Sequence, residues 1–371
     1  MEKKRIVIKI GTNLLTKETP AGTVGLNKKY ITKISGQIAE LHQSGNEIIL
    51  VTSGAISAGA GKLRLKGRPK SLPEKQSAAA VGQPLLMAVY DECFQTKNIS
   101  TAQLLLTRED FENRRRYINT RNTVLSLLQQ GVVPIINEND TVSVEEIQFG
   151  DNDTLASLVA IKVEADLLII LTDVEGLCTG DPNRDRNVKC INEVKKITSE
   201  IEEIARKTIG SDYGSGGMCT KVQAAKVATT SGVETVIADG RKDEVLKNII
   251  EGKTTGTRFH PQEKIVARKR WIAFGMKTKG MIMIDDGAVE AITKKCKSLL
   301  PSGIISVEGE YSVGESVSIM DKANNEIARG LTNYSSNDIN KIKGKKSGEI
   351  KKILGVCDFE EVVHRDNLVV L

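Results

Sequence analysis

The feature that most restricts the fold of this sequence is a repeated alternation of short apolar runs with amphipathic segments. Residues 132–136 and 166–172 are dominated by Val, Leu and Ile, as expected of strands buried on both faces of a parallel sheet. Residues 27–43 instead carry apolar side chains at spacings of three and four, which predicts a helix. Alternation of this kind predicts an α/β fold in which helices wrap a mainly parallel sheet.

The same patterns assign the remaining elements. They predict strands at residues 6–10, 47–52, 101–107, 132–136, 166–172 and 233–238. They predict helices at residues 27–43, 74–93, 111–130, 153–163 and 244–250, one after residues 53–55, and one that follows the glycines near 214–217 and runs to about 230. Residues 59–70, rich in glycine and basic side chains, predict a mobile loop. From residue 280 onward, short β-rich pieces at 281–284, 303–307, 316–319 and 327–328 predict a second, compact β domain.

Composition sets broader limits. A chain of 371 residues exceeds the size at which one hydrophobic core usually keeps growing, so two domains are expected. The formal net charge of +6 permits an anionic partner without requiring one. Six cysteines without a C-x-x-C pair, and only three histidines, suggest neither a zinc site nor a disulfide framework, so reduced thiols are expected. The first apolar run is too short for a signal peptide or a membrane span, which predicts a soluble, cytoplasmic protein.

A polar cluster follows the strand predicted at 132–136. Ligands in open α/β sheets bind beyond the carboxyl ends of the strands, which is where Asn137 and Asp140 fall. Asp140 could bind an ammonium group, while Asn137 and Asn152 could donate to a carboxylate and accept from an amine. Asn, Asp and Gly are also the commonest turn formers, so a solvated turn is an equal alternative.

Two further positions could bind an anion. Lys9 lies inside the first predicted strand, and a buried ammonium needs a partner or a ligand unless the alternation points it to solvent. Ser53 precedes a helix whose free N–H groups could receive an anion, although it could equally be an ordinary N-cap.

A glycine-rich loop at residues 213–221 could bind phosphate. Its glycines let backbone N–H groups approach closely, and Lys221 lies on the first turns of the following helix. No G-x-x-x-x-G-K-[ST] occurs in the chain, and no G-x-G-x-x-G follows the first strand. With Lys9 and the polar cluster at the same sheet edge, the loop suits phosphoryl transfer, in which catalysis is mostly positioning and charge neutralisation.

The segments IVIKIGTNLLT, VTSGAISAG, INENDTVSVEEIQFGDNDTLAS, LTDVEGLCTGDP and GSGGMCTKVQAA, in this order, resemble the amino acid kinase family and, within it, the members that act on glutamate. The segments KGMIMIDDGAVEAI, SLLPSGIISVEGEYSVGESVSI and ARGLTNYSS resemble the PUA module that RNA-modifying proteins share. The resemblance covers essentially the whole chain. It implies an α/β/α sandwich at residues 1–260, a linker at 261–275 and a small β-rich PUA domain at 276–371.

The activity that the resemblance implies is phosphorylation of the L-glutamate side-chain carboxylate by ATP with Mg²⁺, giving glutamyl 5-phosphate for proline biosynthesis. Lys9 and Lys221 would stabilise the transferring phosphoryl group and Asp153 would orient them. Glutamate would be held by Ser53, Asn137, Asp140 and Asn152, and ATP by Lys9, Thr172, Asp173, Ser215, Gly216, Gly217, Met218, Cys219, Thr220 and Lys221. The resemblance also implies a homo-oligomer (dimer or tetramer), inhibition by proline, and a glutamyl phosphate reductase downstream.

Two other functions stay open on sequence alone. One is an amino acid kinase with another acceptor, such as uridylate, carbamate or aspartate. The other is an RNA-binding protein whose tail presents lysines, although the aromatic residues available for stacking are few. The tail residues concerned are Lys341, Lys343, Lys345, Lys346, Lys351 and Lys352, with Tyr311, Tyr334 and Phe359.

Two local features carry their own expectations. Thr52 stands where the family commonly has a second serine, which leaves the hydroxyl in place. Cys219 lies inside the predicted nucleotide loop and raises a hypothesis of thiol sensitivity, against the alternative of a small packing residue.

Overall fold

The computed structural model describes residues 3–18, 24–65, 67, 69–143, 152–180, 188–207, 217–262, 276, 278–355 and 359–371. The chain divides into two compact units, Met1–Lys264 and Ile265–Leu371. Buried apolar side chains form two clusters in the first unit, one on each face of its sheet, and one cluster in the second. Most of the linker predicted at 261–275 lies outside the described residues.

Within the described residues, the first unit is built on an eight-stranded sheet in the order β5-β6-β4-β1-β7-β9-β10-β8. Every pair from β5 to β9 is parallel, and β10 runs antiparallel to β9. The strands are β1 (Arg5–Ile10), β4 (Glu47–Val51), β5 (Thr101–Leu106), β6 (Val133–Glu138), β7 (Leu167–Thr172), β8 (Glu193–Val194), β9 (Glu234–Asp239) and β10 (Thr257–Phe259). The predicted mainly parallel α/β architecture is confirmed. A separate hairpin pairs β2 (Thr16–Glu18) with β3 (Val24–Leu26).

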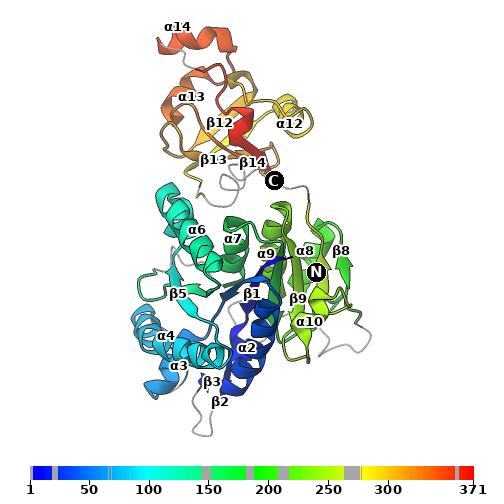
Figure 1. Cartoon of the computed structure of the whole chain (residues 1–371). Coiled ribbons are helices and arrows are strands. Elements are labelled where there is room, and N and C mark those ends of the chain that lie inside the picture. The colour runs from blue at the N-terminus through cyan, green and yellow to red at the C-terminus, as the bar shows by residue number, and fades with distance from the viewer. Residues whose placement is uncertain are drawn as a thin grey trace. The chain divides into compact units, whose positions relative to one another are not determined.

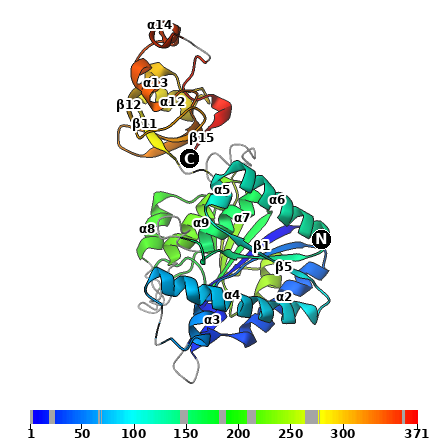
Figure 2. The ribbon, with the colours of Figure 1, turned by 90° about the vertical axis from the view of Figure 1, so that its left-hand side faces the viewer.

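Helices cover both faces of this sheet (Figures 1 and 2). One layer contains α2 (Lys28–Gln43), α4 (Leu72–Gln95) and α10 (Val245–Ile250); the other contains α6 (Arg114–Gln129), α7 (Asn152–Lys162), α8 (Ser199–Lys207) and α9 (Met218–Thr230). On β1, Ile6 and Ile8 pack into the α2 layer whereas Val7 packs into the α7 layer. Because successive strand side chains point to opposite faces, Lys9 lies on the same face as Val7, toward α7 and α9.

The predicted loop at 59–70 is wrong in its first part, because α3 (Ala55–Lys62) continues through it. A Cβ atom on Gly59 would lie 1.8 Å from the carbonyl oxygen of Ala78, and one on Gly82 would lie 1.8 Å from that of Ala55. These glycines therefore allow the α3 and α4 backbones to touch, instead of breaking a helix. The single helix predicted at 111–130 is divided into α5 (Glu109–Glu112) and α6, with Asn113 as the N-cap of α6.

The prediction that the cysteines are reduced is wrong for two of the six, since Cys178 and Cys190 form a disulfide. Both residues lie between β7 and α8 in the sequence. They pair with each other in an isolated antiparallel β-bridge, with their Cα atoms 3.8 Å apart. A separation of 12 residues matches no disulfide motif. Only the path of the backbone after β7 brings these thiols together.

The second unit contains a five-stranded mixed sheet in the order β12-β11-β13-β14-β15. Its elements are β11 (Gly280–Ile284), α12 (Asp286–Thr293), β12 (Ile304–Glu308), β13 (Ser316–Met320), β14 (Glu326–Leu331), α13 (Ser336–Ile342), α14 (Ile350–Leu354) and β15 (Leu368–Val370). The four β-rich pieces predicted from the sequence fall on β11 to β14, whereas β15 was not predicted. Across the described part of the chain, no helix is both long and apolar enough to cross a membrane.

Candidate active site

Two buried lysines from distant parts of the chain share one buried carboxylate. Asp153, on the first turn of α7, is fully buried. Its Oδ1 atom lies 2.5 Å from the Nζ of Lys9 on β1, and its Oδ2 atom lies 3.1 Å from the Nζ of Lys221 on α9. A strand and two helices therefore place both ammonium groups within reach of the same point.

The two lysines favour the ionised form of the Asp153 carboxyl. Burial by itself would raise the pKa of Asp153, but the ammonium groups of Lys9 and Lys221 outweigh it and hold that pKa below its usual value. The amino terminus of α9 adds the positive end of a helix dipole, and its N-cap, Gly217, has no side chain to occupy the space before the helix. The arrangement is suited to an anion.

Ser53, Asn137 and Asn152 lie together beside this cluster. The Nδ2 atom of Asn152 donates to the carbonyl oxygen of Thr52 (2.8 Å), to Ser53 Oγ (2.7 Å) and to Asn137 Oδ1 (3.1 Å). Within the described residues, the Oδ1 atom of Asn152 is buried and has no hydrogen-bond partner. The alternative role of Ser53 as a helix N-cap is wrong, because Gly54, with a φ of +96°, holds that position.

Asp140 lies in the loop after β6, three residues beyond Asn137. Burial, with a smaller contribution from the Glu138 carboxylate, raises the pKa of Asp140 to about 7. A carboxylate in such surroundings would gain from a cationic partner.

The residues predicted to hold ATP lie at the neighbouring strand end and on α9. Thr172, buried at the end of β7, donates from Oγ1 to Asp173 Oδ1 (3.2 Å), while Asp173 Oδ2 accepts from Asn13 Nδ2 (3.0 Å). Thr220 Oγ1 donates to the carbonyl oxygen of Gly217 (2.8 Å). The first turn of α9 also carries the buried Met218 and the half-buried Cys219, a free thiol. Ser215 and Gly216 lie outside the described residues.

Gln83 belongs to the same polar group but was not predicted from the sequence. Its side chain is buried on α4, and its Oε1 atom accepts from Asn137 Nδ2 at 2.9 Å. A single glutamine within a helical pattern carries no motif. The only sequence signal was its position between Gly82 and Pro84, two residues that are uncommon inside helices.

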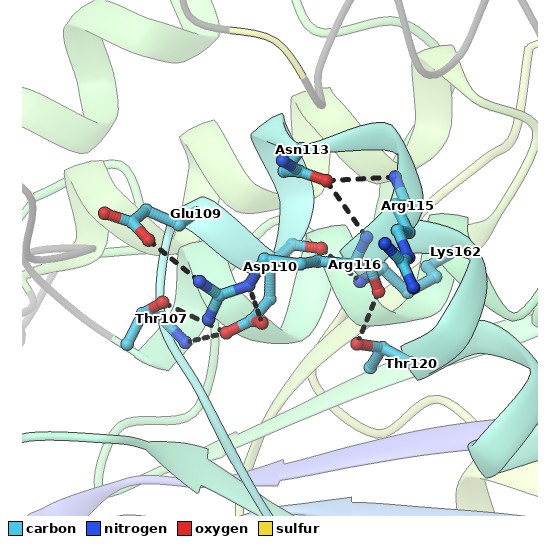
Figure 3. A network of polar contacts seen from close by, with 8 residues as sticks. All are labelled: Thr107, Glu109, Asp110, Asn113, Arg115, Arg116, Thr120 and Lys162. Atoms are coloured by element: carbon cyan, nitrogen blue, oxygen red, sulfur yellow. Dashed lines mark hydrogen bonds and ion pairs between the residues drawn. The ribbon is translucent and has the colours of Figure 1, made fainter.

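A second polar network lies at the opposite end of α7 (Figure 3). The buried Lys162 donates from Nζ to the carbonyl oxygen of Asp110 (2.9 Å) and lies 3.8 Å from the Phe111 ring centroid and 4.6 Å from that of Tyr117. The Asp110 carboxylate instead accepts from Arg116 Nε (2.8 Å). Burial lowers the pKa of Lys162 to about 7, although the Asp110 carboxylate acts in the opposite direction.

Comparisons with known proteins identify the family of this chain. Residues 4–239 match the amino acid kinase family and residues 280–354 match the PUA domain. Glutamate 5-kinase from Thermoanaerobacter pseudethanolicus is 53% identical over 368 residues, covering 99% of this chain and 98% of that protein. Glutamate 5-kinase from Moorella thermoacetica is 48% identical, covering 100% of this chain and 97% of that protein. The fold is shared with carbamate kinase from Giardia lamblia bound to AMP-PNP, at a TM-score of 0.51 and 20% identity over 70% of this chain and 99% of that one. The chain therefore belongs to the amino acid kinase family.

Proposed function

We propose that this protein transfers the γ-phosphoryl group of ATP to the side-chain carboxylate of L-glutamate, giving glutamyl 5-phosphate, the first step of proline biosynthesis. The observation that carries the proposal is the pair of buried ammonium groups, Lys9 and Lys221, held on Asp153 beside an amide cluster. Both reactants are anions, so the transfer needs positive charge at the point where they meet. The full-length relatives are glutamate 5-kinases, which supports glutamate over uridylate, carbamate or aspartate as the acceptor.

Phosphoryl transfer requires the protein to position the two reactants and to neutralise their negative charge. A glutamate carboxylate is already ionised at neutral pH, so its oxygen can attack the γ-phosphorus without a general base. The bond to the β–γ bridging oxygen breaks and ADP leaves. Lys9 and Lys221 stabilise the charge that develops during transfer, and Asp153 keeps their ammonium groups in place. Their contribution therefore falls mainly on the transition state.

Glutamate recognition follows from the hydrogen bonds already made. The N–H groups of Asn152 are committed to Thr52, Ser53 and Asn137, so its Oδ1 atom remains to accept from the substrate's ammonium group. The sequence also allowed Asn152 to donate to a carboxylate, and we now propose only the acceptor role for it. Ser53 Oγ accepts from Asn152 and can use its own O–H to donate to a carboxylate. Asp140 supplies the counter-charge for the ammonium group.

We assign the nucleotide to Thr172, Asp173, the first turn of α9 as far as Lys221, and residues 215–217, which precede that helix in the sequence. No atom of the described residues would lie within 4 Å of a Cβ atom on Gly217, which leaves room for a phosphate to approach this helix end closely. Both oxygens of Asp153 are engaged by lysines, and we therefore assign Mg²⁺ to the phosphate oxygens of ATP. When bound, the ion supplies further charge neutralisation.

Several wider properties are part of the proposal and rest on family resemblance. We infer a cytoplasmic homo-oligomer, inhibition by proline at the glutamate site, and transfer of the acyl phosphate to a glutamyl phosphate reductase.

An RNA-binding function of the second unit is the weaker candidate. Its lysines at 341, 345, 346, 351 and 352 are exposed. Of the aromatic residues described in this unit, Tyr311 and Tyr334 are buried in its core and Phe359 alone is open to solvent. Base stacking needs exposed aromatic faces. We therefore propose that this unit is structural or regulatory.

The deciding assay measures ADP release from ATP and Mg²⁺ with and without L-glutamate, with hydroxylamine trapping the acyl phosphate. Uridylate, carbamate and aspartate serve as comparison acceptors. We expect glutamate-dependent ADP release and a trapped hydroxamate. Equal turnover with every acceptor, or none with glutamate, would contradict the proposed function.

A further inference from the structure

We propose that Gln83 is a positioning residue that fixes the amide orientations of Asn137 and Asn152, and so makes the site select substrates with a free amino group. This inference rests on the proposed function. Gln83 contacts no reacting atom in the mechanism above, and it acts through other side chains.

The contacts form a continuous relay across four elements. Gln83 on α4 donates from Nε2 to Gln103 Oε1 on β5 (3.0 Å) and accepts at Oε1 from Asn137 Nδ2 (2.9 Å). Asn137, at the end of β6, accepts at Oδ1 from Asn152 Nδ2 (3.1 Å). Asn152 begins α7, and its Nδ2 atom also reaches Ser53 Oγ (2.7 Å).

The direction of each amide in this relay is determined by its neighbours. Asn137 turns its nitrogen toward Gln83, and its oxygen also accepts from the backbone N–H of Glu138 (2.9 Å). Asn152 turns its nitrogen toward the Thr52 carbonyl oxygen (2.8 Å). Reversing Asn152 would place its oxygen against two groups that can only accept, the Thr52 carbonyl oxygen and Asn137 Oδ1. Of the amide atoms of Gln83, Asn137 and Asn152, the one left buried without a partner is therefore the acceptor Asn152 Oδ1.

Gln83 matters because Asn137 is almost fully buried, at 2% exposure. Without the Gln83 oxygen, the Asn137 N–H would lose its acceptor in a site that water hardly reaches, which is costly. Asn137 could then rotate, and the constraint on Asn152 would weaken. Gln83 is itself held close because Gly82 lets α4 touch the backbone of α3.

The unpaired Asn152 Oδ1 atom favours a hydrogen-bond donor over an acceptor. It suits an ammonium group, which has three donors and no acceptor, and it repels a carboxylate. The site should therefore discriminate strongly between L-glutamate and glutarate, the same dicarboxylate without the amino group. Gln83 contributes to that discrimination and not to the phosphoryl transfer itself.

The test compares kcat and KM for L-glutamate and glutarate in the full-length protein. For Gln83→Met we expect the glutamate KM to rise roughly tenfold, with kcat within about twofold. Activity on glutarate should change little, so the ratio of kcat/KM values for the two substrates should fall roughly tenfold. Gln83→Glu keeps an oxygen facing Asn137 and should recover most of the glutamate KM.

Two comparison variants separate positioning from general damage. Gln103→Met removes only the exposed outer partner of Gln83 and should leave the ratio nearly unchanged. Adding Gln83→Met to Asn152→Ala should cause no further loss of discrimination, because the group that Gln83 positions is already gone. Thermal unfolding checks that each variant is folded.

An unchanged ratio in folded Gln83→Met would overturn the inference, as would an equal fall in kcat for both substrates. Wild-type protein that uses glutarate as well as glutamate would also overturn it, while leaving the proposed phosphoryl transfer intact. Absence of glutamate-dependent ADP release in the wild type would refute the proposed function, and the inference with it.

Discussion

The two ends of α7 hold buried lysines in different ways. At its amino-terminal end, Lys9 and Lys221 are paired with the carboxylate of Asp153. At its carboxyl-terminal end, Lys162 contacts a backbone carbonyl and two aromatic rings. The first arrangement holds the pKa of Asp153 below its usual value, whereas burial lowers the pKa of Lys162 to about 7. A directly bound counter-charge therefore distinguishes a cation site available for chemistry from a lysine that tethers helices.

The sharpest test of this difference is loss of each ammonium group in turn. Lys221→Met or Lys9→Met should lower kcat by roughly a hundred- to a thousandfold, the range over which one electrostatic donor stabilises a transition state. The KM for glutamate should change far less. Lys162→Met is the matched control, because it removes a buried lysine at the other end of α7, and its kcat should stay within a few-fold of wild type. Steady-state ADP release measures all three, and a defect confined to KM in the first two variants would refute the assigned roles.

The next largest effect concerns substrate binding by Asp140. Asp140→Asn should raise the glutamate KM by roughly ten- to a hundredfold, the range expected for a hydrogen bond to a charged group. Because the pKa of Asp140 is raised to about 7, its carboxyl becomes neutral as the pH falls below that value. Wild-type kcat/KM for glutamate should then fall roughly tenfold per pH unit. Profiles of kcat/KM from pH 5.5 to 8.5 should show this decrease at low pH in the wild type and not in Asp140→Asn. The same decrease in both proteins would mean that another residue binds the ammonium group of glutamate.

Lys162 should show its effect in stability and not in catalysis. Between about pH 7 and pH 10 an unfolded lysine binds a proton that the folded Lys162 has lost, so the free energy of unfolding rises with pH across this window. Below about pH 7 Lys162 is protonated in both the folded and the unfolded state, so the free energy cost of burying its charge is fully present. Relative to Lys162→Met, the wild type should therefore gain about 2 kcal/mol from pH 7 to 8.5. Urea unfolding at both pH values measures this; a pH-independent difference would show that Lys162 stays charged throughout.

The smallest effect is expected from removing the second unit. Both ends of α7, and every residue assigned to the site, belong to the first unit, which has its own core on both faces of its sheet. A chain ending at residue 264 should keep kcat within a few-fold of the full-length protein. Complete loss of turnover in a truncated protein that circular dichroism shows to be folded would mean that the second unit contributes to catalysis.

The errors of the sequence-based predictions have a common cause. The sequence pattern predicts a loop at Gly59, but this glycine lies in α3 and allows two helices to touch. The cysteine spacing predicts reduced thiols at Cys178 and Cys190, but the two form a disulfide across an antiparallel bridge. Gln83 carried no motif, although it completes the hydrogen bonds of the amide relay. Each outcome depends on segments that lie near each other only after folding.

The sequence by itself determined the alternation of strands and helices, the family, and most of the residues of the candidate site. These follow from local periodicity and from motifs that each lie within one segment. The tertiary structure alone decided which side of β1 Lys9 occupies, which carboxylate binds both lysines, and which amide atom stays unpaired. Those properties depend on side-chain direction and burial where distant segments pack, and local sequence patterns do not specify either.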